Sequence, residues 1–318
     1  MAIGEHLTEF CGLPAFDFPD AGEELSGLPA AESVAWRIGV ESYDADEAWV
    51  DCFGRFLAAV DVKQVRALIV GCWNDVNETN SDAVIEALIA VKDQLPELRG
   101  LFLGDIVDAE SEISRINQGL VTPLLEEFPA LEEFGVRGGE ELDFLELRHD
   151  RLRKLTAQTG GLHVEVVRGI AASDLPALTH LDLWLGTAEY GGNSEVADLA
   201  PILAGNRLPS LEHLALRNSE FQDAICAALA SAPIVARLHT LDISMGVLTD
   251  DGAAALLDGQ PLSHLKSLDM HHNYLSDGMR TRLREALELA GVQLNLDGGD
   301  ATAGERDGTV ERSVAVAE

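Results

Sequence analysis

The segments "LHTLDISMGVLTDDGAAALLDG" (238–259) and "LKSLDMHHNYLSDGMRTRLREAL" (265–287) lie close together in the chain and share one pattern. Each begins with L-x-x-L-x followed by an apolar residue, passes through a short turn, and ends with apolar residues at helical spacing. A unit of strand, turn and helix this short cannot bury its apolar face alone. The pattern therefore predicts stacked repeats.

The same frame recurs along most of the chain at intervals of 21 to 33 residues. Its eight clear copies are "VRALIV" (65–70), "LRGLFL" (98–103), "LEEFGV" (131–136), "LRKLTA" (152–157), "LTHLDL" (178–183), "LEHLAL" (211–216), "LHTLDI" (238–243) and "LKSLDM" (265–270). Weaker copies begin at Ala35 and Gly291. Positions 1, 4 and 6 of a short parallel strand turn inward and stack on their equivalents in neighbouring repeats. The sequence predicts an α/β solenoid.

Helical segments are expected between the strands, on the outer face. "SDAVIEALIAVKDQL" (81–95) carries apolar residues on one face and is predicted to begin at an N-cap, Ser81. The other predicted outer segments are "SEVADLAPILAG" (194–205), "FQDAICAALASAP" (221–233), "TDDGAAALLDG" (249–259) and "SDGMRTRLREALELAG" (276–291). The interval between Leu131 and Leu152 is too short for an outer helix and is predicted to run as loop or extended chain.

From about Val65 to Leu296 the chain resembles the leucine-rich repeats, in particular the long helical type of the ribonuclease inhibitors. The two segments quoted first carry this resemblance, together with Gly252 and Gly278 at the entry to the outer helices. It implies a right-handed, curved solenoid with a parallel sheet on the concave face and helices on the convex face. The whole chain, including "EHLTEFCGLPAFDFPD" (5–20), also resembles an uncharacterised family of cytoplasmic bacterial leucine-rich-repeat proteins. That family has no assigned catalytic residues, so the resemblance implies none here.

Three regions follow from this pattern. Residues 1–34, with Phe10, Leu13, Phe16 and Phe18, are expected to form an N-terminal cap, because a solenoid end exposes a strand edge and an open core. Residues 35–296 form the solenoid. Residues 297–318 are rich in glycine and charge and are expected to be a disordered acidic tail.

The charge balance limits the possible partners. The chain has 55 acidic and 22 basic residues, a formal net charge of −33. Such a field repels nucleic-acid phosphates and anionic membranes, and favours a protein or peptide partner with a basic surface. No apolar run of about 18 residues and no secretory signal is visible, and the four cysteines form no C-x-x-C pair. A cytoplasmic protein is expected.

Motifs of the common catalytic classes and nucleotide-binding loops are absent from the sequence, so neither catalysis nor a cofactor is expected. Two alternatives stay open. Asp242, Asp269 and His271 could hold a metal ion, or the protein could be an accessory that presents a substrate to a modifying enzyme.

Positions 3, 5 and 7 of each strand are expected on the concave face, where neighbouring strands lie about 4.8 Å apart. Carboxylates at Asp242 and Asp269 should repel each other unless cations such as Arg217 and His271 offset the repulsion. Trp184 is either an exposed anchor for a partner or covered by the loop at 186–198. The predicted partner-binding residues are Phe102, Arg137, Asp182, Trp184, His213, Arg217, Asp242, Asp269 and His271.

Overall fold

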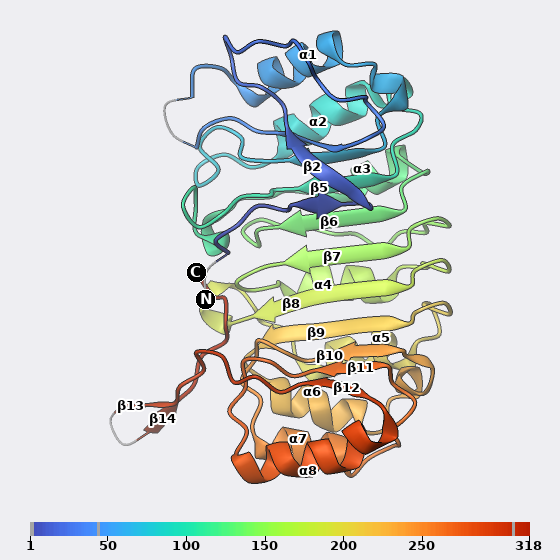
Figure 1. Cartoon of the computed structure of the whole chain (residues 1–318), viewed down its shortest axis with the longest axis vertical. Helices are drawn as coiled ribbons and strands as arrows, with labels where there is room; N and C mark the ends of the chain where they lie inside the picture. Colours follow the sequence, from blue (N-terminus) through green and yellow to red (C-terminus); the bar gives the residue numbers. More distant parts are fainter. Residues whose placement is uncertain (1–2, 43–44, 307–308) are drawn as a thin grey trace.

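The computed structural model of the protein describes residues 3–42, 45–306 and 309–318. Within these ranges, twelve strands form one sheet in chain order, and two more form a separate hairpin (Figure 1). β1 is antiparallel to β2, and every later neighbour pair in the large sheet is parallel. The strands are β1 (Glu9–Phe10), β2 (Leu13–Asp17), β3 (Ala35–Ile38), β4 (Ala67–Val70), β5 (Gly100–Leu103), β6 (Glu133–Arg137), β7 (Lys154–Gln158), β8 (His180–Gly186), β9 (His213–Ser219), β10 (Thr240–Asp242), β11 (Ser267–Asp269), β12 (Gln293–Asn295), β13 (Gly304–Arg306) and β14 (Thr309–Glu311).

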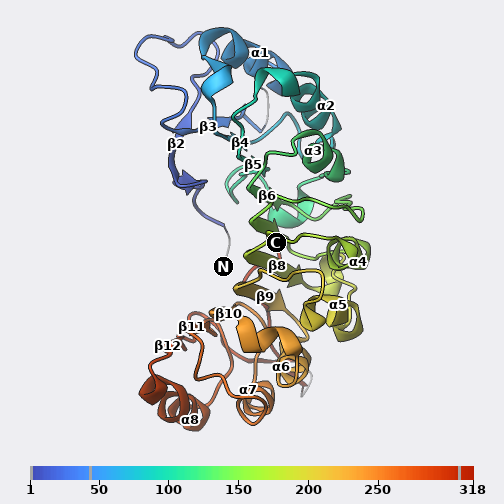
Figure 2. The same cartoon turned by 90° about the vertical axis from the view of Figure 1, so that its right-hand side faces the viewer.

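The sheet lines the concave side of a curved molecule, and the helices cover the convex side (Figure 2). This arrangement is the predicted α/β solenoid. The helices are α1 (Trp49–Ala59), α2 (Asp82–Ala90), α3 (Thr122–Glu127), α4 (Val164–Ala172), α5 (Ala200–Ala204), α6 (Gln222–Leu229), α7 (Asp250–Leu257) and α8 (Asp277–Leu287). Among the described residues, no helix is long and apolar enough to span a membrane.

The core lies between sheet and helices and is built from the predicted frame positions. In all eight clear copies, the residues at positions 1, 4 and 6 are at most 3% exposed. Each buried leucine of this kind stabilises the fold by about 1.5–3 kcal/mol relative to an exposed one. The inward stacking that the frame predicts is therefore confirmed.

The register of the first weak copy differs from the prediction. Ala35 pairs with Ala67, and Trp36 with Leu68, so Ala35 is at the third position of the frame rather than the first. Trp36 is fully buried and packs against Phe18 and Phe56. A large aromatic residue thus occupies the place that leucine holds in later repeats, and this conceals the frame.

The predicted outer helices form at the expected places, but the predicted side-chain cap at Ser81 is wrong. Ser81 precedes α2, yet its hydroxyl is buried without a hydrogen-bond partner. The Asn80 side chain instead accepts a hydrogen bond from the Asp82 backbone N–H at 3.2 Å.

The short interval between β6 and β7 runs as extended chain, as predicted. Isolated bridges join Asn117 to Glu140 and Leu120 to Asp143, and Phe144 is buried in the core where a helix would otherwise pack. This extended chain passes close to α4. A Cβ atom added at Gly169 would lie 1.8 Å from the Phe144 carbonyl oxygen.

Gly169→Ala is expected to destabilise the protein by about 1–3 kcal/mol because the new methyl group meets backbone. Helix propensity alone predicts the opposite sign, a gain of up to about 1 kcal/mol. Gly54→Ala in α1 is the matched control, since a Cβ there meets nothing within 4 Å, and this variant should be neutral or more stable. Urea unfolding of both variants measures the difference. A stabilised Gly169→Ala variant would contradict the close packing.

The described residues at both ends of the chain differ from the predicted N-terminal cap and disordered C-terminal tail. Phe16 and Phe18 pack on Trp36, whereas Phe10 turns onto the concave face. Composition predicts disorder for residues 297–318, but Val314–Val316 are buried against the solenoid. Ala315 bonds the Met245 carbonyl oxygen and Val316 bonds the Asn218 side chain, in the turns after the strands, which average composition does not reveal.

Candidate functional site

The concave face is divided into a covered part and an open part. The N-terminal segment, defined here as residues 3–17, crosses the face over β3–β6 (Figures 1 and 2). The face of β8–β12 carries the partly exposed polar side chains at positions 3, 5 and 7 of the frame.

Aromatic packing holds the N-terminal segment on the sheet. The Phe10 and Phe102 rings meet edge to face with centroids 5.8 Å apart, over the buried side chain of Ile69. Small residues make room for this contact. A Cβ atom at Gly100 would lie 2.7 Å from the Cys11 Cβ, and one at Gly135 would lie 2.4 Å from the Phe102 ring.

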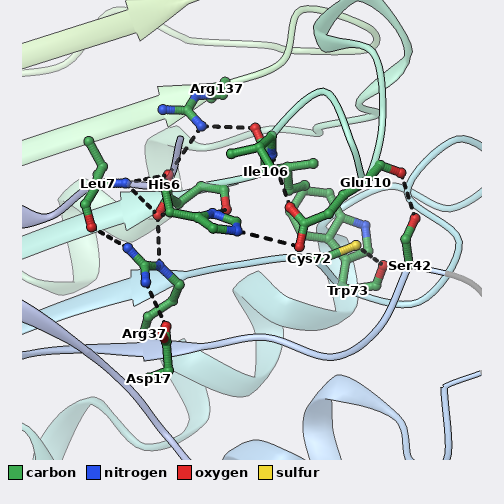
Figure 3. Close-up of polar contacts among 12 residues, drawn as sticks. His6, Leu7, Asp17, Arg37, Ser42, Cys72, Trp73, Ile106, Glu110 and Arg137 are labelled. Atoms are coloured by element: carbon green, nitrogen blue, oxygen red, sulfur yellow. Dashed lines mark hydrogen bonds and ion pairs between the residues drawn. The ribbon is translucent and has the colours of Figure 1, made fainter. Parts of the chain in front are cut away.

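A buried carboxylate fixes the same segment by charge. Asp105 is fully buried, and its two oxygens accept hydrogen bonds from Arg37 Nε at 2.7 Å and Arg137 Nη1 at 3.1 Å. The Leu7 backbone N–H also donates to Asp105 at 3.1 Å. Arg37 further contacts the Leu7 carbonyl and the exposed Asp17, as Figure 3 shows.

His6 completes this network. Its Nδ1 lies 3.0 Å from the Asp105 carbonyl oxygen, and its Nε2 lies 3.6 Å from Glu110 (Figure 3). The Asp105 carboxylate, 3.6 Å from Nδ1, raises the pKa of His6 in spite of partial burial. Burial opposes ionisation of Asp105, but His6 and the two arginines outweigh it and hold the pKa of Asp105 below its ordinary value.

Phe102 and Arg137 are therefore not on an open surface. Phe102 is 3% and Arg137 is 2% exposed. Arg137 also donates to Gln158 at 2.9 Å and to the Ile106 carbonyl oxygen at 2.8 Å. The prediction that these two residues form part of an exposed partner-binding face is wrong, because residues far away in the sequence fold over Phe102 and the charge network holds Arg137.

Arg217 is the centre of the open part. Its guanidinium group donates to Asp182 at 2.9 and 3.1 Å and to Asp242 at 3.2 Å, and so joins β8, β9 and β10. Burial raises the pKa of Asp182 to about 6, against the opposing effect of Arg217. Arg217 thus pairs with Asp242 as predicted, but the second carboxylate that it binds is Asp182 on β8 and not Asp269.

Trp184 is not an exposed anchor. The side chain is 7% exposed, and the Arg217 guanidinium lies 4.9 Å from its ring centroid, at cation–π distance. The exposed alternative for this residue is wrong, because Arg217 folds across the indole from the neighbouring strand.

Asp269 and His271 form a second polar pair near the C-terminal end of the sheet. Asp242 and Asp269 occupy paired positions on β10 and β11. The Asp269 carboxylate lies 2.8 Å from His271 Nδ1 and accepts a hydrogen bond from Asn295 at 3.1 Å. Despite burial, these bonds lower the pKa of Asp269, and the hydrogen bond to Asp269 raises that of His271.

Two histidines adjoin this region. The rings of His180 and His213 stack with centroids 5.2 Å apart on paired positions of β8 and β9. Burial lowers the pKa of both, which favours their neutral forms. Within residues 3–42, 45–306 and 309–318, no group of three or more histidine, cysteine or acidic side chains is arranged to hold a metal ion.

The sequence interpretation missed Asp105, Arg37 and His6. Their signal was weak: a run of small residues on the concave positions of the first repeats, including Ala67, Gly100 and Gly135, indicates that something packs closely there. The identity of the covering segment was not visible in any local pattern.

These features define the class of protein: a leucine-rich-repeat type of solenoid with a partly covered concave face. A Bacteroides fragilis protein of known crystal structure is similar to the chain with 30% identity and a TM-score of 0.73, over 79% of this chain and 70% of that one. The chain belongs to the same family as that protein.

A leucine-rich-repeat protein of Leptospira interrogans shows a more distant similarity, with 15% identity and a TM-score of 0.40. The match covers 88% of this chain and 58% of that protein. No protein-family model and no curated protein matches the chain.

Proposed function

We propose that the protein is a non-catalytic interaction module that binds a basic segment of a partner protein on the open concave face of β8–β12. One observation carries this proposal. The N-terminal segment covers the apolar part of the concave face, while the polar part keeps Asp182 and Asp269 partly accessible, with the largely buried Asp242 between them.

The charge of this face supports a basic partner. Arg217 is shared between Asp182 and Asp242, and His271 pairs with Asp269, so carboxylates outnumber permanent cations in this group by three to one. The whole chain adds a net charge of −33, which attracts basic partners over long range and repels acidic ones.

Two further features agree with the expected setting. All four cysteines are free thiols, as is usual in a reducing compartment such as the cytoplasm. The outer helices α6, α7 and α8, which follow β9, β10 and β11 in turn, support a closer relation to the ribonuclease-inhibitor type of repeat.

The test compares two charge-matched double variants in quantitative pull-downs from native lysate. Asp182→Asn/Asp269→Asn removes two concave carboxylates, and Glu86→Gln/Glu285→Gln removes two exposed convex ones. For proteins retained by the wild type at low salt, the retained amount should be about tenfold lower with the concave variant and unchanged with the convex variant. High salt should abolish retention. Equal retention by both variants would refute the concave site.

Hydrogen exchange then locates the contact directly. Adding a retained partner should slow exchange in β8–β12 and leave the helices on the convex face unchanged. Protection confined to the convex helices would assign the partner to the other surface.

A further inference from the structure

The last residues of the sequence lie across the turns that follow the strands. After β12 the chain forms the β13–β14 hairpin away from the body and then returns to the ends of the strands (Figure 1). Val314, Ala315 and Val316 are buried there, although the preceding hairpin exposes side chains such as Val310. We call residues 313–317 the C-terminal strap.

The strap is held through its backbone by three successive repeats. Tyr274 Oη bonds both the carbonyl oxygen and the N–H of Ser313, at 2.8 and 2.9 Å. The Ala315 N–H donates to the Met245 carbonyl oxygen at 2.8 Å. The Asn218 side chain accepts from the Val316 N–H at 3.0 Å and donates to the Val316 carbonyl oxygen. An amide that pairs both backbone groups of one residue recognises an extended peptide without regard to its side chain.

The residues that hold the strap share an unusual backbone conformation. Asn218, Met245 and His272 have φ values of 55°, 66° and 49°, in the left-handed region that side-chain-bearing residues rarely adopt. They occupy the same position in three consecutive repeats, and each contacts the strap; His272 Nε2 lies 3.1 Å from the Ser313 carbonyl oxygen. Strained backbone of this kind is found at ligand clamps and other functional sites.

The groove also limits the size of what it holds. A Cβ atom at Gly160 would lie 2.1 Å from the Ala317 carbonyl oxygen, so the strap lies directly on the backbone of an earlier repeat. The buried strap residues are alanine and valine, with no larger side chain.

We propose that the turns after β9–β11 are a peptide-binding groove for an extended segment of small apolar residues in a partner protein, of the type Ser-Val-Ala-Val. The strap occupies this groove as an intrachain ligand. Because a tethered segment has a high effective concentration, a partner segment binds only when the strap leaves. The groove lies at the strand ends, so it is independent of the concave surface assigned above.

The experiment uses the full chain with the strap displaced. Val314→Asp/Val316→Asp places unpaired carboxylates in the groove and should release the strap. Val310→Asp is the matched control, because Val310 is 52% exposed in the adjoining hairpin. The probe is a fluorescent synthetic peptide with the sequence of residues 312–318, followed by fluorescence anisotropy.

The peptide should bind the Val314→Asp/Val316→Asp variant at least about tenfold more tightly than the wild type or Val310→Asp. Adding Asn218→Ala to the displaced variant should weaken binding at least about tenfold, since the paired backbone contacts are lost. Ala315→Pro is a second way to displace the strap without new charge, because it removes the N–H that donates to Met245.

Circular dichroism establishes that each variant is folded. If the peptide fails to bind both displaced variants, or binds equally well after Asn218→Ala, the groove proposal is wrong. Neither outcome affects the Asp182/Asp269 comparison, so failure of this proposal is distinct from failure of the proposed function.

Discussion

Asp105→Ala is expected to lower the free energy of unfolding by about 3–5 kcal/mol, the usual loss when one partner of a buried charge cluster is removed. Asp105 is fully buried and is shared by Arg37 and Arg137. Its removal leaves two largely buried guanidinium groups without this counterion. It also removes the acceptor of the Leu7 N–H, so the N-terminal segment loses one of its polar attachments.

Asp17→Ala is the control, because Asp17 pairs with the same Arg37 but its side chain is 77% exposed. A solvent-exposed pair of this kind contributes at most about 1 kcal/mol. Urea unfolding measures both losses, and hydrogen exchange of residues 6–17 reports detachment of the N-terminal segment. Similar losses for the two variants would mean that the buried network does not fix the segment.

The repeat could be predicted from sequence because its cause is local. Inward residues at positions 1, 4 and 6 are set by strand geometry, and a leucine such as Leu241 or Leu268 needs no distant information to be assigned to the core. The same logic failed at β3, where Trp36 replaces leucine and conceals the register. A repeat that is recognised by its leucines cannot be recognised where a residue of different shape fills the same core position.

Exposure on the concave face could not be predicted, because it depends on contacts between residues distant in sequence. Phe102, at position 5 of the frame in β5, points away from the core as expected. It is nevertheless buried by Phe10, which is 92 positions earlier in the sequence. Trp184 shows the same effect at a smaller separation in sequence, since Arg217 from the next strand covers its ring. Strand geometry gives the side of the sheet on which a residue lies but not what lies over it.

The strap was missed for a related reason. Averaged over residues 297–318, composition is polar, and this average hides the short run of valine and alanine at 314–317. Such a run cannot form a core of its own, but it can dock on polar groups that the solenoid already presents, the Asn218 side-chain amide and the Met245 carbonyl group.

Phe134 in β6 and Phe102 in β5 lie on opposite faces of the sheet, and substituting each tests the solenoid core and the N-terminal segment separately. Phe134→Ala is expected to cost about 3–5 kcal/mol, because Phe134 is fully buried at an inward position in the middle of the array. A solenoid depends on contacts between neighbouring repeats, so a cavity at a central rung weakens the stacking on both sides.

Phe102→Ala removes the same side chain from the opposite face of the adjacent strand, where the Phe102 ring lies beside Gly135. Phe102 belongs with Phe10 and Ile69 to a small apolar cluster separate from the main core. Its removal is therefore expected to cost only the free energy that this cluster contributes to holding the N-terminal segment. We therefore expect a smaller loss than for Phe134→Ala, with faster hydrogen exchange confined to residues 6–17 and the covered face of β3–β6. Exchange that accelerates equally throughout the array in both variants would show that the N-terminal segment is an integral part of the core rather than a cover laid upon it.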